Sequence, residues 1–148
     1  MSQARGLWRG DKPVEAIEAF KRAIEVGEPL GDEAYEAYTT SMSLGSSAAA
    51  AVGQFALSEA WSDRILRVCE EHGDIVGVCY ALINRSTLSF LTDQIDRLLV
   101  DLERAVQISR EFGMPLAESM CVRDLGEIYL SLGKPVEGEP YIRRAHAM

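Results

Sequence analysis

The sequence predicts an all-α protein, an α-solenoid of antiparallel helix pairs with about seven helices. Three observations predict this fold: an internal repeat, an apolar rhythm of 3.6 residues, and prolines and glycines where helices should begin and end. Segments that alternate apolar and polar residues between turns, as strands do, are missing. At 148 residues the chain has the size of one domain, so we expect a single helical repeat domain over 1–148.

The internal repeat is clearest at the two ends of the sequence. Residues 12–16, KPVEA, recur as residues 134–138, KPVEG. The offset in residue number is 122 (134 − 12), or three periods of about 41. Gly31, Gly73 and Gly113 are spaced by 42 (73 − 31) and then by 40 (113 − 73), in agreement with that period. We therefore expect repeats at roughly 1–31, 32–73, 74–113 and 114–148.

Each period contains two segments with the apolar spacing of a helix. The most regular is 93–112, where apolar residues recur at intervals of three and four. The remaining predicted helices are 13–26, 32–44, 54–72, 74–91, 115–132 and 135–147. Leu7 and Trp8 predict the tail of a further helix. Residues 46–53 fit either a helix extension or a loop, and we favour the helix.

Proline and glycine punctuate these segments. Prolines stand where a first helical turn should begin, at 13, 115 and 135. Glycines stand where helices should stop, at 31, 73, 113 and 133. Short connections make successive helices antiparallel neighbours. Pro140 lies one turn inside the last helix, where it would remove a hydrogen bond and bend the axis.

Residues 125–133, LGEIYLSLG, resemble the tetratricopeptide repeat, whose first helix ends in Leu-Gly-x-x-Tyr-x-x-x-Gly. Gly138 and Ala145 match the small residues of its second helix. The resemblance implies a right-handed superhelix in which Gly126 and Gly138 let two backbones approach. The family period is about 34 residues. The longer period here resembles the variant found in bacterial signalling ATPases and maltose-regulator-type activators.

Two repeats depart from the family pattern. In the middle repeat, Arg85 stands where the wedge leucine is expected, and Leu98 replaces a small residue. The first repeat, near Ser43–Gly45, needs a slip of one residue to align. Repeat boundaries are therefore least defined in these two regions.

The resemblance also implies a concave groove lined by the first helix of each pair. The matching positions are Tyr80, Ile83, Thr87, Phe90, Met120, Arg123, Glu127 and Leu130. Large apolar side chains at helical spacing are alternatively core residues. Arg123 and Glu127, four residues apart, either pair with each other or leave Arg123 to hold a partner's carboxylate.

No constellation of catalytic residues is evident, so we expect neither an enzyme nor a cofactor. His72 and His146 lack ligand-spaced companions, and no phosphate-binding glycine loop appears. The cysteines, Cys69, Cys79 and Cys121, are an odd number within helical patterns and should be reduced core thiols.

The formal net charge of −8 disfavours nucleic acid and favours a protein or peptide with basic segments, although a solvated acidic surface explains the same charge. No apolar run predicts a membrane span or a signal peptide, so we expect a cytoplasmic protein. The expected function is protein binding or scaffolding in the groove. The alternatives are a regulatory segment of a larger bacterial signalling or transcription-regulator protein, and a homodimer through open array ends.

Overall fold

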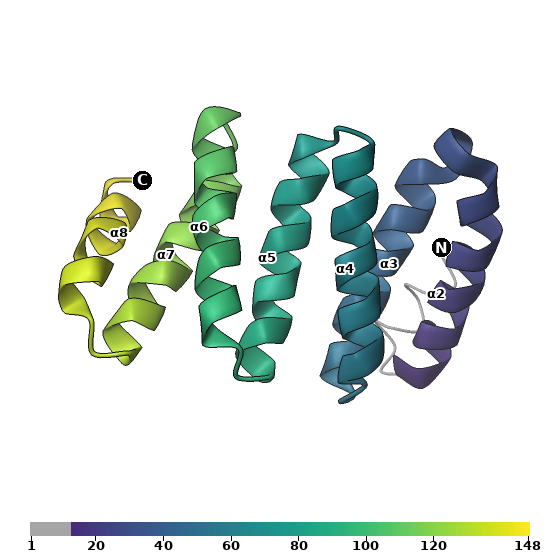
Figure 1. The fold of residues 1–148 in the computed structure, drawn as a ribbon, viewed down its shortest axis with the longest axis horizontal. Helices are drawn as coiled ribbons and strands as arrows, with labels where there is room; N and C mark the ends of the chain where they lie inside the picture. The colour runs from purple at the N-terminus through teal and green to yellow at the C-terminus, as the bar shows by residue number, and fades with distance from the viewer. Residues whose placement is uncertain (1–12) are drawn as a thin grey trace. The chain divides into compact units, whose positions relative to one another are not determined.

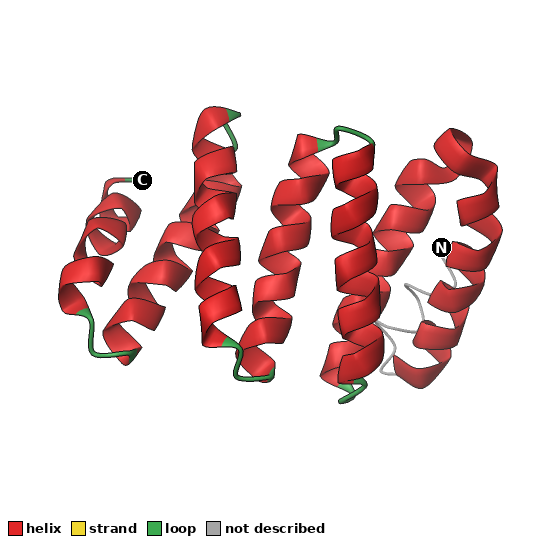
Figure 2. Cartoon of the chain, in the orientation of Figure 1, coloured by secondary structure: helices red, strands yellow, loops and turns green. Residues whose placement is uncertain are grey.

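The computed structural model describes residues 13–148, so the helix tail expected at Leu7 and Trp8 lies outside the described part. Within residues 13–148 the chain forms seven α-helices and one 3₁₀-helix, without a strand (Figure 2). The all-α helical repeat expected from the sequence is confirmed. The helices belong to two compact units, one ending at Gly73 and the other running from Asp74 to Met148.

The first unit contains α2 (Pro13–Gly27), η1 (Glu28–Ala34), α3 (Tyr35–Ala51) and α4 (Phe55–Glu71) (Figure 1). Helix α3 packs against both α2 and α4. The largest fully buried side chains of this unit are Phe20, Ile17 and Met42. Burial of these apolar side chains supplies most of the driving force for folding the unit.

The second unit contains α5 (Ile75–Leu91), α6 (Ile95–Glu111), α7 (Pro115–Ser131) and α8 (Pro135–Ala147). Each helix packs against the next, and α5 also contacts α7. The largest fully buried side chains of this unit are leucines, namely Leu82, Leu88, Leu98, Leu102 and Leu125. Helix α8 continues through Pro140.

From α3 onward the helices begin at positions 35, 55, 75, 95, 115 and 135, a constant step of 20 in residue number. From α3 onward, one helix pair therefore corresponds to a repeat interval of 40 (75 − 35). The step from α2 to α4 is 42 (55 − 13), so the three periods from α2 to α8 have the expected mean of about 41. The step from α2 to α3 is 22 (35 − 13), and η1 lies within it. Residues 32–34 belong to η1, so the helix predicted from 32 starts three residues later. Residues 46–51 belong to α3, so the helix extension that we favoured over a loop is confirmed for these residues.

The turns after α3 to α7 share one conformation. The residue after each helix cap has a positive φ, and it is Gly53, Gly73, Asp93, Gly113 or Gly133. A Schellman hydrogen bond closes the turns after α3, α5, α6 and α7: for example, Gln94 donates its backbone N–H to the Ser89 carbonyl oxygen at 2.8 Å. Glycine adopts this left-handed conformation without strain. The predicted glycine stops at 31, 73, 113 and 133 all have positive φ.

The repeat interval of 40 corrects the alignment of the first repeat. Gly45, Arg85 and Leu125 occupy equivalent positions (85 − 45 = 125 − 85 = 40), so no slip of one residue is needed. The expected approach of Gly126 and Gly138 is confirmed, because a Cβ atom on Gly138 would lie 3.3 Å from the Gly126 carbonyl oxygen. A side chain at Gly138 would be closer to this oxygen than an ordinary van der Waals contact, so its neighbours would have to shift.

Candidate functional site

The expected groove positions lie on α5 and α7, and most are open to solvent. On α5, Tyr80 and Phe90 are 42% and 61% exposed, and Thr87 is also exposed. On α7, Leu130 is 49% exposed, and Arg123 and Glu127 are exposed as well. These six residues are accessible to a partner. Met120 is half-buried, and Ile83 is buried with 8% exposed. The buried residues of α5 occupy a wide arc of the helix, which includes Ile83.

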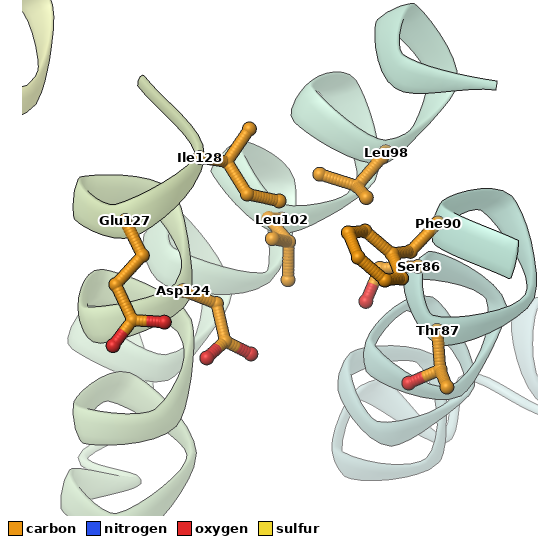
Figure 3. A pocket seen from close by; sticks show the side chains of 8 residues that line it. All are labelled: Ser86, Thr87, Phe90, Leu98, Leu102, Asp124, Glu127 and Ile128. Carbon is orange, nitrogen blue, oxygen red and sulfur yellow. The ribbon is translucent and has the colours of Figure 1, made fainter. Parts of the chain in front are cut away.

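A pocket of about 240 Å³ in the second unit brings three of the expected residues together, Thr87, Phe90 and Glu127 (Figure 3). Its complete lining is Ser86, Thr87, Phe90, Leu98, Leu102, Asp124, Glu127 and Ile128. Helices α5, α6 and α7 all contribute to it. Drug-sized ligands occupy pockets of about 300 to 1,000 Å³, so this one has the size for a single large side chain.

Leu98 and Leu102 of α6 form an apolar part of the lining, and each is 1% exposed. Leu98 is equivalent to Ser58 of α4 and Gly138 of α8 at the repeat interval. In the first unit, the Ser58 and Ser46 hydroxyls hydrogen-bond each other at 3.0 Å. The middle helix pair thus has a large apolar side chain where its neighbours have small ones, and that side chain lines the pocket.

Asp124 and Glu127 place two carboxylates on the same wall of the pocket, one helical turn apart on α7. Figure 3 shows both side chains extending from α7, with Thr87 across the pocket from Asp124. Partial burial raises the pKa of the Asp124 carboxyl above its usual value, and the negative charge of Glu127 raises that pKa further. The nearby Arg123 acts in the opposite direction, and its Nε atom lies 3.6 Å from Asp124 Oδ1.

The ion pair of Arg123 is thus made with its neighbour Asp124, not with Glu127 as one interpretation of the sequence had it. The Arg123 side chain is 63% exposed. It lines a second pocket, of about 410 Å³, together with Glu127, Leu130, Ile142, Ala145 and His146. Glu127 belongs to both pockets, so the two form neighbouring parts of one surface that follows α7.

Sequence reasoning missed five lining residues of the first pocket: Ser86, Leu98, Leu102, Asp124 and Ile128. Asp124 could have been found, because it lies three residues before Glu127 and therefore on the same helix face. Leu98 was noticed only as a departure from the repeat pattern. Its role in the lining depends on how α6 packs against α5, which the sequence pattern does not specify.

No protein-family model matches the chain, and neither does any curated protein. The resemblance to tetratricopeptide repeats therefore rests on the sequence motif.

The cysteines and His72, which the sequence analysis also considered, have structural roles in the helices that carry them. Cys69, Cys79 and Cys121 are buried and form no disulfide, as expected for core thiols. Burial raises the pKa of Cys121 to about 12, which keeps that thiol protonated. His72 caps α4, and its ring stacks on Tyr35 at a centroid distance of 4.2 Å.

Among residues 13–148, no group of histidine, cysteine or acidic side chains could hold a metal ion. No helix in that range has the length and apolar character of a membrane span.

Proposed function

We propose that this chain is a tetratricopeptide-like protein-binding module whose second unit binds a segment of another protein along α5 and α7. One observation carries the proposal. The exposed apolar side chains Phe90 and Leu130 each line a pocket, and the two pockets share Glu127. A surface with apolar anchors beside polar groups is typical of a site that recognises a peptide.

The chemistry of this surface supports binding rather than catalysis. Its charged side chains are Asp124, Glu127 and Arg123. The lining of the first pocket has no histidine, cysteine or lysine beside its two carboxylates that would complete an acid–base or nucleophilic arrangement. The lining of the second pocket places His146 beside Glu127 but contains no nucleophile and no second carboxylate. A partner segment would instead gain affinity by covering Phe90 and Leu130, because removing their apolar surface from water is favourable.

Selection from a random peptide library displayed on phage tests the proposal. We expect the intact chain to enrich peptides, and a chain with Phe90→Glu to bind the enriched peptides at least about tenfold more weakly, since it places a charge on the apolar anchor. Val100→Glu is the matched control, because Val100 of α6 is 64% exposed and does not line the pocket. Circular dichroism checks that both variants stay folded.

Two results would reject the proposal. One is that the intact chain enriches no peptide. The other is that Phe90→Glu and Val100→Glu weaken binding equally, which would place the binding surface elsewhere.

A further inference from the structure

The pocket between α5, α6 and α7 has two chemically different parts. Leu98, Leu102 and Ile128 are apolar, and Phe90 adds an aromatic ring that is 61% exposed. Asp124 and Glu127 supply the charged groups of the lining, and both are acidic. A matching ligand therefore needs an apolar stem that ends in a positive charge.

We infer that this pocket binds an arginine side chain of the partner segment. The inference deepens the proposed function and rests on it. A guanidinium has two edges that can each donate hydrogen bonds to a carboxylate, and carboxylates one helical turn apart suit two such edges. Its flat face also stacks on an aromatic ring such as that of Phe90. The ammonium of lysine would satisfy one carboxylate but offers no flat face for stacking.

The charge balance of the site favours this occupant. Arg123 lies 3.6 Å from Asp124, but its side chain is 63% exposed. Among the described residues that line the two pockets, one exposed guanidinium therefore accompanies two carboxylates. The Asp124 side chain is 41% exposed, and its partial burial disfavours the charged carboxylate, so a bound guanidinium would add a favourable contact to it. The chain's net charge of −8 adds a long-range attraction for a basic segment.

The surface outside the pocket favours an arginine within a protein over a free small molecule. Leu130 lies beyond Glu127 in the neighbouring pocket and is 49% exposed. A free guanidinium compound would leave Leu130 and much of Phe90 uncovered. A peptide that anchors its arginine at Asp124 and Glu127 can continue over both side chains.

Titration with blocked amino acids, followed by NMR of the ¹⁵N-labelled chain, tests the pocket directly. The probes are N-acetyl-arginine amide, its lysine counterpart and its citrulline counterpart, which keeps the shape of arginine without the charge. We expect saturable shifts at Thr87, Phe90 and Asp124 with the arginine probe, at least about threefold weaker binding of the lysine probe, and no binding of citrulline.

The double variant Asp124→Asn/Glu127→Gln should lose the response to the arginine probe. Its control, Asp96→Asn/Glu137→Gln, removes the same charge from exposed positions of the second unit outside this pocket and should keep the response. Equal binding of arginine and citrulline, or an unchanged response in the Asp124/Glu127 double variant, would overturn the inference.

A second arm separates the inference from the proposed function. Peptides enriched by phage selection are resynthesised with citrulline at each arginine, and we expect at least a tenfold loss of affinity at one position. If these peptides bind in a Phe90-dependent manner but tolerate citrulline, the proposed function stands and the arginine inference fails. If the arginine probe binds but no peptide is enriched, assignment of the pocket to a protein segment is overturned.

Discussion

Arg85 of α5 and Asp101 of α6 form a two-pronged ion pair inside the second unit, with Nε to Oδ2 at 2.7 Å and Nη2 to Oδ1 at 2.8 Å. The side chain of Asp101 is 4% exposed and that of Arg85 is 19% exposed. At the repeat interval, the equivalent residues in the last helix pair are Leu125 and Tyr141. The repeat therefore accepts a charged pair at positions where the next repeat has a leucine and a tyrosine.

Removing one member of this pair should be costly. We expect Asp101→Ala to lower the free energy of unfolding by about 3–5 kcal/mol, because the Arg85 guanidinium loses its buried counter-charge. Urea unfolding followed by circular dichroism measures the change. The double variant Arg85→Leu/Asp101→Tyr, which installs the pair of the last repeat, should be within about 1 kcal/mol of the original chain. A double variant as unstable as Asp101→Ala would show that leucine and tyrosine cannot replace the ion pair here.

Glu118 should make stability depend on acid pH. Its side chain is 6% exposed and lies 3.1 Å from Arg144 and 2.7 Å from Arg110. Hydrogen bonds from Arg144 and then from Arg110 lower the pKa of the Glu118 carboxyl, against the opposing effect of burial. A pKa that is lower in the folded than in the unfolded chain stabilises the fold above the unfolded value, and this stabilisation is lost as pH falls through the folded value.

Urea unfolding between pH 7 and pH 3 tests this dependence. Glu118→Gln should cost about 1–3 kcal/mol at pH 7 and should lose less stability than the original chain as the pH falls. Glu36→Gln, a change at an exposed residue of α3, is the control and should keep the original pH dependence. Parallel pH curves for the original chain and Glu118→Gln would contradict the role of this ion cluster.

Asp93 marks a turn at which a glycine would be more stable. Its φ of 56° lies in the left-handed region, and the equivalent positions 53, 73, 113 and 133 all hold glycine. This conformation costs non-glycine residues about 1–2 kcal/mol, and aspartate less than most. Asp93→Gly should therefore raise stability by up to about 1 kcal/mol, seen as a higher Tm. The reverse change, Gly113→Ala, should lower Tm, and an unchanged Tm in both variants would contradict the explanation.

The sequence predicted the helices well because the apolar spacing of 3.6 residues and the Pro and Gly positions are local properties. The repeat length predicted from the sequence is an average over unequal repeats, because the sequence pattern does not reveal that the additional residues between α2 and α3 form η1 over 28–34. Arg85 was recognised as a departure, but its partner Asp101 follows only from the packing of α5 against α6. The pocket was not predicted for the same reason, because Leu98 and Asp124 line it together only once α5, α6 and α7 have packed against one another.

Gly45 in the interior of α3 offers a test of packing against helix propensity. A Cβ atom at this position would lie 2.7 Å from Trp61 Cζ3 and 3.2 Å from Phe20 Cβ. Both neighbours are buried, with Trp61 6% exposed and Phe20 fully covered. At a solvent-exposed helical site, alanine is more favourable than glycine by about 1 kcal/mol. Here the overlap should reverse that sign, because overpacking a filled core costs about 1–3 kcal/mol.

We therefore expect Gly45→Ala to lower the free energy of unfolding and to shift the tryptophan fluorescence as the indole of Trp61 moves. Trp61→Leu alone should also be destabilising, because it leaves a cavity next to Gly45. Combining the two changes should cost less than the sum of the single changes, since the new methyl group enters the vacated space. A gain in stability for Gly45→Ala alone would show that Trp61 yields freely, and that the close contact does not select glycine at this position.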